Sequence, residues 1–157
     1  MKIVLLTLGK TSQKNIKDEI LLFSKRLSHY TDFELQEIPR LKSSTKISKS
    51  ELKKSEGQMI MKYINSNDYV VLLDENGKSY SSIDFSKKIE NFMLNSFKRV
   101  FFVVGGAFGF SDELYSRCNE KVSLSKMTFS HQMVRLFFIE QLYRAFTIIN
   151  NEKYHHQ

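Results

Sequence analysis

The middle of the chain, residues 99–144, reads RVFFVVGGAFGFSDELYSRCNEKVSLSKMTFSHQMVRLFFIEQLYR. It begins with an apolar run at residues 100–104, which stops at Gly105. A short apolar run bounded by glycines is typical of a buried strand that ends in a loop. Residues 122–125 predict a second strand, and a long helix is predicted to begin at Ser130. Because an open α/β sheet binds its ligand where strands end and helices begin, we expect a ligand site here.

Three more strands are predicted, at residues 2–8, 33–38 and 68–73, the last ending at a turn with the Asn76-Gly77 pair. The apolar residues of the first are consecutive, which is typical of a parallel sheet covered on both faces. Strands alternate with helices along the whole chain, so we predict an α/β fold with a mainly parallel sheet and helices on both faces. The three earlier helices carry Ile16, Ile20, Phe23, Leu27 and Tyr30 after a Ser12 N-cap; Leu52, Met59, Ile60 and Tyr63; and Ile83, Ile89, Phe92 and Met93 after a Ser81 N-cap.

The length of 157 residues predicts a single domain, residues 1–157, since no linker or repeat divides it. The only cysteine, Cys118, excludes an internal disulfide, and no spaced Cys/His set suggests zinc. No segment reaches membrane-spanning length, and the apolar start is too short for a signal peptide, so a cytoplasmic protein is expected. A formal net charge of +7 raises the odds of a nucleic-acid partner modestly.

The segment at residues 40–54 is basic and rich in serine, which predicts a mobile loop that leads into a helix. Its lysines could contact RNA phosphate or form a solvated linker, and charge runs favour the linker.

The glycine motif at residues 105–109 matches neither the dinucleotide fingerprint nor the P-loop, because its spacing differs and no Gly-Lys-Ser/Thr ending follows. Taken alone, the motif could be a tight turn from a strand into a helix capped by Ser111.

Longer motifs carry a resemblance. The segments GGAFG, SLSKMTFSHQ and EQLYRAF follow one another in order, and LLDENGKSYSS, KIVLLTLGK and Tyr154-His155 extend the match over nearly the whole chain. Together they resemble the ribosomal RNA large-subunit methyltransferase H family of the SPOUT superfamily. This resemblance implies a deep C-terminal trefoil knot and S-adenosylmethionine as cofactor. It also implies methylation of N3 of a pseudouridine in 23S ribosomal RNA of the assembled ribosome.

The sequence departs from the family pattern at two positions. Ser130 is at a position where the family commonly has proline. This change is harmless, because serine is a good helix N-cap. His156 replaces the usual terminal basic residue, which puts one backbone contact in doubt.

The resemblance also implies roles for residues. Tyr154 and His155 would form the catalytic and RNA-binding tail, with the tyrosine stacking on a base and the histidine positioning it or taking its proton. We interpret His131 as structural and His29 as a surface residue. Methyl transfer from a sulfonium is an in-line displacement that needs no metal. The implied cofactor-binding residues are Leu73, Gly105, Leu124, Ser125, Lys126, Met127, Thr128 and Phe129.

The last helix predicts a homodimer, because it is apolar on two faces and so short a chain has little material to cover both. The alternative is a deeply buried helix in a monomer. Arg135 and Arg144 are candidate substrate-binding residues that could reach phosphate across the dimer, while Arg144 could instead pair with Glu140. The two faces consist of Val134, Phe138, Gln141, Ala145 and Ile149, and of Leu136, Ile139, Tyr143 and Phe146.

Two alternatives stay open. One is a SPOUT methyltransferase that acts on transfer RNA. The other is a non-catalytic, ribosome-associated RNA-binding protein. The chain keeps all three cofactor loops that the resemblance implies, at Leu73, Gly105 and residues 124–129, and a protein that only binds RNA has no need of them.

Overall fold

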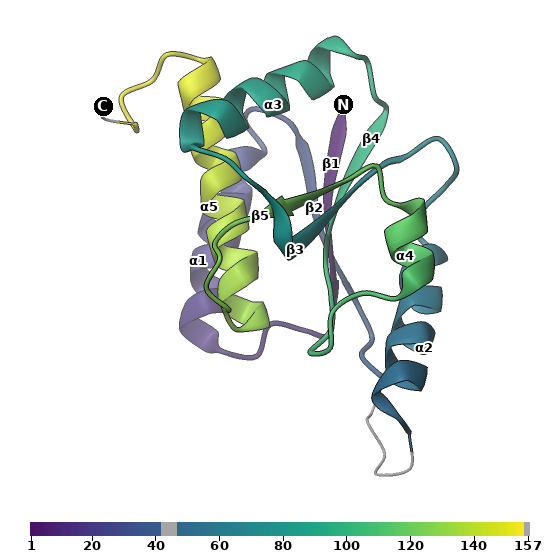
Figure 1. The fold of residues 1–157 in the computed structure, drawn as a ribbon. Coiled ribbons are helices and arrows are strands. Elements are labelled where there is room, and N and C mark those ends of the chain that lie inside the picture. The colour runs from purple at the N-terminus through teal and green to yellow at the C-terminus, as the bar shows by residue number, and fades with distance from the viewer. Residues whose placement is uncertain (42–46, 156–157) are drawn as a thin grey trace.

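The computed structural model describes residues 1–41 and 47–155, which form one five-stranded sheet flanked by helices (Figure 1). The strand order is β2-β1-β4-β3-β5, and every pairing is parallel. The strands are β1 (Lys2–Leu8), β2 (Asp32–Ile38), β3 (Tyr69–Ser79), β4 (Arg99–Val104) and β5 (Glu120–Ser123). The helices are α1 (Lys14–Leu27), α2 (Lys49–Met61), α3 (Ser82–Leu94), α4 (Asp112–Arg117) and α5 (His131–Ile149).

Helices cover both faces of the sheet, as predicted. On one face α1, α3 and α5 pack on Ile3, Leu5 and Phe102, and on the other α2 and α4 pack on the intervening residues of the same strands, such as Phe101. Consecutive strand residues alternate between the two cores, which is why the strands read as continuous apolar runs. The α/β fold with a parallel sheet is therefore confirmed, while the trefoil knot stays a prediction.

The third strand differs from its prediction. Asn76-Gly77 does not end β3, which continues to Ser79. Its pairing with β5 is interrupted between Leu73 and Lys78, because the residues between them leave the ladder before the strand pairs again with Val122. The Asn76-Gly77 pair therefore does mark a local irregularity in the strand, but the prediction that the strand ends there is wrong. The residues that leave the ladder lie at the edge where the parallel strands end.

The serine N-caps were predicted correctly with one exception, and one strand lies two residues from its predicted position. Ser81, Ser111 and Ser130 each accept a hydrogen bond from a backbone amide in the first turn of their helices. Ser12 is not an N-cap; α1 begins after Gln13, and the Ser12 hydroxyl instead accepts a bond from Gln132. The predicted strand at residues 122–125 lies two residues earlier, at β5.

The basic segment is largely helical where the structure describes it. Residues 49–54 form the first turns of α2, which Ser48 and Glu51 cap reciprocally. A mobile loop is therefore wrong for that part of the segment, because the capping box starts the helix there. The rest of the expected loop includes residues 42–46, which lie outside the described part.

Helix α5 is buried more completely within one subunit than its sequence suggested. From the sequence we expect Ile139 and Phe146, on the second of the two apolar faces, to meet a partner subunit, but within one subunit they are 0% and 2% exposed. The reason is that α1 and α3 flank α5 on both sides (Figure 1). The prediction that this stripe stays free is therefore wrong, as is the inward placement of Met93 on α3, which is exposed. Among the helices of residues 1–41 and 47–155, none is both long and apolar enough to cross a membrane.

Candidate functional site: a pocket at the carboxyl edge of the sheet

A pocket of about 520 Å³ lies where β3, β4 and β5 end. Three loops and the first turn of α5 form it: the end of β3 from Leu73, the glycine loop at residues 105–110, and the segment between β5 and α5. The volume is within the range of pockets that bind small molecules, and the carboxyl edge of a parallel sheet is where such ligands bind.

The structure brings together nearly all of the predicted cofactor-binding residues. Leu73, Gly105, Leu124, Ser125, Met127, Thr128 and Phe129 line the pocket. Lys126, between two of them, is exposed and does not line it.

The glycine loop is packed too tightly for a side chain at its first position. A methyl group on Gly105 would lie 3.0 Å from the Phe110 ring and 3.3 Å from the Gly109 carbonyl oxygen. Phe110 is itself buried in the core beneath the loop, so its ring has little room to move. The shape of this pocket wall therefore depends on the absence of a side chain at residue 105.

Polar residues that the sequence analysis missed also line the pocket. Tyr115 donates a hydrogen bond of 2.6 Å to Asp74, and burial together with this bond raises the pKa of Tyr115 to about 12. Thr128 donates to Glu75 at 3.3 Å. The two carboxylates give the pocket a negative rim suited to a cationic ligand. Their signal was present in the sequence: both follow an apolar strand directly.

His131 also lies on the pocket wall, at the first residue of α5. Its pKa is lowered by burial and, to a smaller extent, by the positive charges of Arg40 and Arg135. The neutral imidazole therefore persists to a lower pH than in an ordinary histidine. A neutral imidazole can accept a proton or a hydrogen bond in the pocket, which the interpretation of His131 as structural did not consider.

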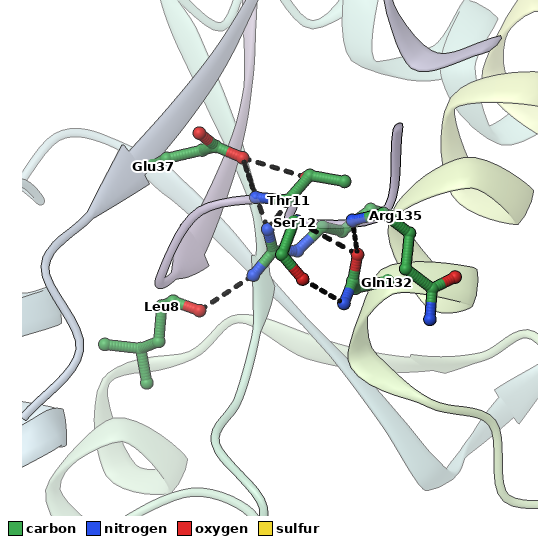
Figure 2. Close-up of polar contacts among 7 residues, drawn as sticks. Leu8, Thr11, Ser12, Glu37, Gln132 and Arg135 are labelled. Atoms are coloured by element: carbon green, nitrogen blue, oxygen red, sulfur yellow. Dashed lines mark hydrogen bonds and ion pairs between the residues drawn. The ribbon is translucent and has the colours of Figure 1, made fainter. Parts of the chain in front are cut away.

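Arg135 is held inside the protein by polar contacts with the ends of β1 and β2 (Figure 2). Its guanidinium donates to the Leu8 carbonyl at 2.7 Å and to the Thr11 hydroxyl at 3.0 Å, and it pairs with Glu37 at 3.3 Å. Gln132, one turn earlier, binds the segment after β1 through Ser12. These contacts fasten the ends of β1 and β2 to α5. With 2% of its surface exposed, Arg135 has a structural role here and its guanidinium does not meet solvent phosphate.

Replacing Arg135 by methionine is expected to lower the free energy of unfolding by about 3 kcal/mol, the usual cost of breaking a buried ion pair. Urea unfolding at neutral pH measures this difference. Lys17→Met is the matched control, since it removes one positive charge from an exposed helical position and should change stability by less than about 0.5 kcal/mol. Equal stability of the two variants would contradict the structural role of Arg135.

The predicted RNA-binding residues of the tail gather at the other end of α5. The Arg144 guanidinium bonds Glu140 at 2.5 Å, which confirms that predicted pair, and lies 4.7 Å from the centre of the Tyr154 ring. Tyr154 packs against Tyr143 and donates to Glu140 at 3.1 Å. His155 follows, with its Nδ1 buried and without a hydrogen-bond partner among the described residues. The tail is thus folded onto α5.

The two groups of predicted residues cannot form one site within a subunit. His131 is in the pocket, and Arg144, which contacts Tyr154, lies thirteen residues further along the same helix. At a rise of 1.5 Å per residue, this places them about 20 Å apart. The pocket and the tail therefore lie at opposite ends of α5, as Figure 1 shows for the start of the helix and the C-terminus.

Comparison with known proteins identifies the family. A family model described as a predicted SPOUT methyltransferase matches residues 1–155. The chain belongs to the SPOUT methyltransferase family. It is 52% identical over 157 residues to ribosomal RNA large subunit methyltransferase H of Christiangramia forsetii, and 50% identical to that of Flavobacterium johnsoniae. Both matches cover 100% of each chain.

A solved structure agrees with the fold. The probable methylase family protein from Haemophilus influenzae matches with a TM-score of 0.54 over 97% of this chain and 67% of that one. Its sequence identity is 14%, so this match shows the fold alone.

Membership of the SPOUT methyltransferases confirms the resemblance and, with it, methyl transfer from S-adenosylmethionine as the chemistry of the chain. The residues present fit that cofactor. Leu73, Leu124 and Val134 offer apolar walls to an adenine, while Asp74 and Glu75 suit the positive charges. In residues 1–41 and 47–155, no group of three or more His, Cys, Asp or Glu side chains could hold a metal ion.

Proposed function

We propose that this SPOUT methyltransferase methylates N3 of a pseudouridine in 23S ribosomal RNA of the assembled ribosome, acting in the cytoplasm as a homodimer. The observation that carries the proposal is the convergence of seven predicted cofactor-binding residues in one pocket. The full-length relatives support the choice of substrate, because their names specify large-subunit ribosomal RNA. The net charge of +7 agrees with an RNA partner.

The chain's own residues would position the reactants and manage one proton. S-adenosylmethionine supplies an activated methyl group, so the protein's main task is to align the nucleophilic nitrogen with it. The N3 proton must leave, and two imidazoles are candidate acceptors: His131 within the pocket and His155 in the tail.

We propose further that each active site combines the pocket of one subunit with the tail of the other. Tyr154 lies about 20 Å from the pocket of its own chain, as estimated from the helix rise. Two α5 helices packed antiparallel across a twofold axis would bring each tail to the start of the partner's α5, where the pocket opens. Arg144, which contacts the Tyr154 ring, would then reach the RNA phosphate from the partner side.

Exposed apolar side chains offer a surface for this dimer. Leu21 and Leu22 on α1 are 57% and 42% exposed, although α1 lies beside α5. Met133 and Phe137 on α5 are only half-buried within one subunit. An apolar strip along neighbouring helices is typical of a surface that a second copy covers.

Leu22→Asp is expected to convert the dimer into a monomer, because it would place an unpaired charge in the interface. Sedimentation velocity at micromolar concentration measures the change. Leu94→Asp is the control, since Leu94 is 74% exposed at the far end of α3 and should leave the dimer intact. A wild-type protein that sediments as a monomer would contradict the homodimer.

Mass mapping of modified nucleosides tests the substrate. Ribosomal RNA from a strain that lacks the protein should have lost one methylated pseudouridine from the large subunit. Purified protein should restore it on intact ribosomes. Loss of a methyl group from transfer RNA instead would support the alternative SPOUT activity and overturn the proposal.

A further inference from the structure

Glu56 on α2 is a buried carboxyl group that the proposed function does not use. It is 3% exposed, and neither of its oxygens has a hydrogen-bond partner among the described residues. Such a group is costly to bury, because it loses its bonds to water and receives none in return. Its location is therefore expected to have a functional reason.

The carboxyl group of Glu56 lies directly behind the wall of the cofactor pocket. A methyl group on Gly106 would be 2.1 Å from the Glu56 Oε2 atom, so the carboxyl fills the space of a side chain at that residue. Gly106 itself lines the pocket on its other side. The next residue of α2, Gly57, packs equally tightly on the Ser111 hydroxyl, which fixes the helix against the loop.

The surroundings of Glu56 supply little charge. The glycine loop facing it, residues 105–110, carries only glycine, alanine and phenylalanine. From α4, Ser111 and Leu114 pack against the adjacent Gly57. Among residues 1–41 and 47–155, the charged side chain that acts on Glu56 is Arg40, which follows β2; burial raises the pKa of Glu56, and Arg40 only partly offsets this effect. The neutral acid therefore persists to a higher pH than in an exposed glutamate.

We propose that Glu56 is a positioning residue that holds the glycine loop in its cofactor-binding shape and serves, through the Gly106 backbone, as a counter-charge for the sulfonium. This inference rests on S-adenosylmethionine being the cofactor. A ligand in contact with Gly106 lies roughly 8 Å from the carboxyl, the sum of two van der Waals contacts. At that distance and an effective dielectric constant of about 20, a positive charge favours the ionised carboxyl by at least about tenfold.

Two consequences follow for binding. In the pH range where Glu56 of the free protein is partly protonated, S-adenosylmethionine should increase the ionised fraction, and the proton released goes to the buffer. S-adenosylhomocysteine lacks the sulfonium charge and should release fewer protons. After methyl transfer the sulfonium charge is gone, so the carboxyl would take up a proton again, and the attraction that favoured S-adenosylmethionine would no longer hold the spent cofactor.

Titration calorimetry in two buffers of different ionisation enthalpy tests the counter-charge. Wild-type protein should release more protons with S-adenosylmethionine than with S-adenosylhomocysteine across a pH series. Glu56→Gln keeps the shape but cannot ionise, so the difference should vanish and the preference for S-adenosylmethionine should fall about tenfold. This variant also separates Glu56 from His131, which titrates on the same pocket wall.

A double-mutant cycle tests the contact. Gly106→Ala should weaken cofactor binding in the wild-type background and much less after Glu56→Ala, because the second change makes room for the methyl group. Equal proton release and equal preference in wild type and Glu56→Gln, or equal effects of Gly106→Ala in both backgrounds, would overturn the inference alone. No binding of either ligand by wild-type protein would overturn the cofactor assignment and this inference with it.

Discussion

Gly105→Val is expected to weaken S-adenosylmethionine binding by at least about 100-fold, or roughly 2.7 kcal/mol. The added side chain would meet the Phe110 ring at 3.0 Å and the Gly109 carbonyl at 3.3 Å. Because Phe110 is buried, the loop rather than the ring must move, and the wall of the pocket moves with it. Calorimetry measures the loss.

The structure changes the reason given for this effect. From the sequence alone we expect valine at residue 105 to project into the cofactor space, whereas the geometry shows that even its Cβ atom has too little room behind the wall. Gly105→Ala should therefore already weaken binding, by less than valine does. An unchanged thermal midpoint and circular-dichroism spectrum are the controls for folding. Unaltered affinity in both variants would contradict the location of the cofactor.

The course of the sheet was predictable because its central strands β1 and β4 are buried on both faces. β1 and β4 consist of consecutive apolar residues, which distinguishes them from half-exposed strands, whose apolar and polar residues alternate. The irregularity of β3 was harder to predict. Asn76-Gly77 is a local turn signal, but only the long-range pairing of Lys78 with Val122 makes the chain resume the same strand.

The roles of the two arginines of α5 show the limit of helical periodicity. Arg135 and Arg144 are about half a turn apart around the helix, which predicts different roles for them within one subunit. The i,i+4 spacing predicted the Arg144–Glu140 pair correctly. No local sequence pattern predicts that Arg135 faces the ends of β1 and β2, because its partners Leu8 and Glu37 are about a hundred residues or more away in the sequence. The burial of Glu56 depends in the same way on a distant loop.

The meeting of seven residues in one pocket was predictable from motifs, while the distance between pocket and tail was not. Motifs give the order of residues along the chain but not which end of α5 each one meets. The structure shows that Tyr154 contacts Tyr143 and Arg144, far from His131. That separation is the reason why the proposed site, with pocket and tail together, needs two subunits.

Removal of residues 154–157 is expected to abolish methylation of ribosomes while cofactor binding persists. Stacking of a base on an aromatic ring contributes about 1–3 kcal/mol, so Tyr154→Ala alone should reduce turnover by roughly 5-fold to 150-fold. Tyr154→Phe keeps the ring and loses only the hydrogen bond to Glu140, so its effect should be small. Single-turnover rates on purified ribosomes measure each loss.

Controls distinguish a functional tail from a packing residue. Because Tyr154 also packs on Tyr143, each variant requires an unchanged thermal midpoint and an unchanged sedimentation coefficient. His155→Ala, which leaves the Tyr154 contacts in place, tests the second tail residue separately. Full activity of the truncated protein on ribosomes would contradict a role for the tail.

A mixed dimer shows whether the tail serves its own pocket or that of its partner. One subunit carries Gly105→Val with an intact tail, and the other has an intact pocket but lacks residues 154–157. Each variant alone should be inactive. If the sites are shared, a heterodimer purified through two different tags contains one complete site and should show about half of the wild-type rate. If each tail serves its own subunit, neither pocket is complete, and the heterodimer should be as inactive as its parents while still binding one cofactor per dimer.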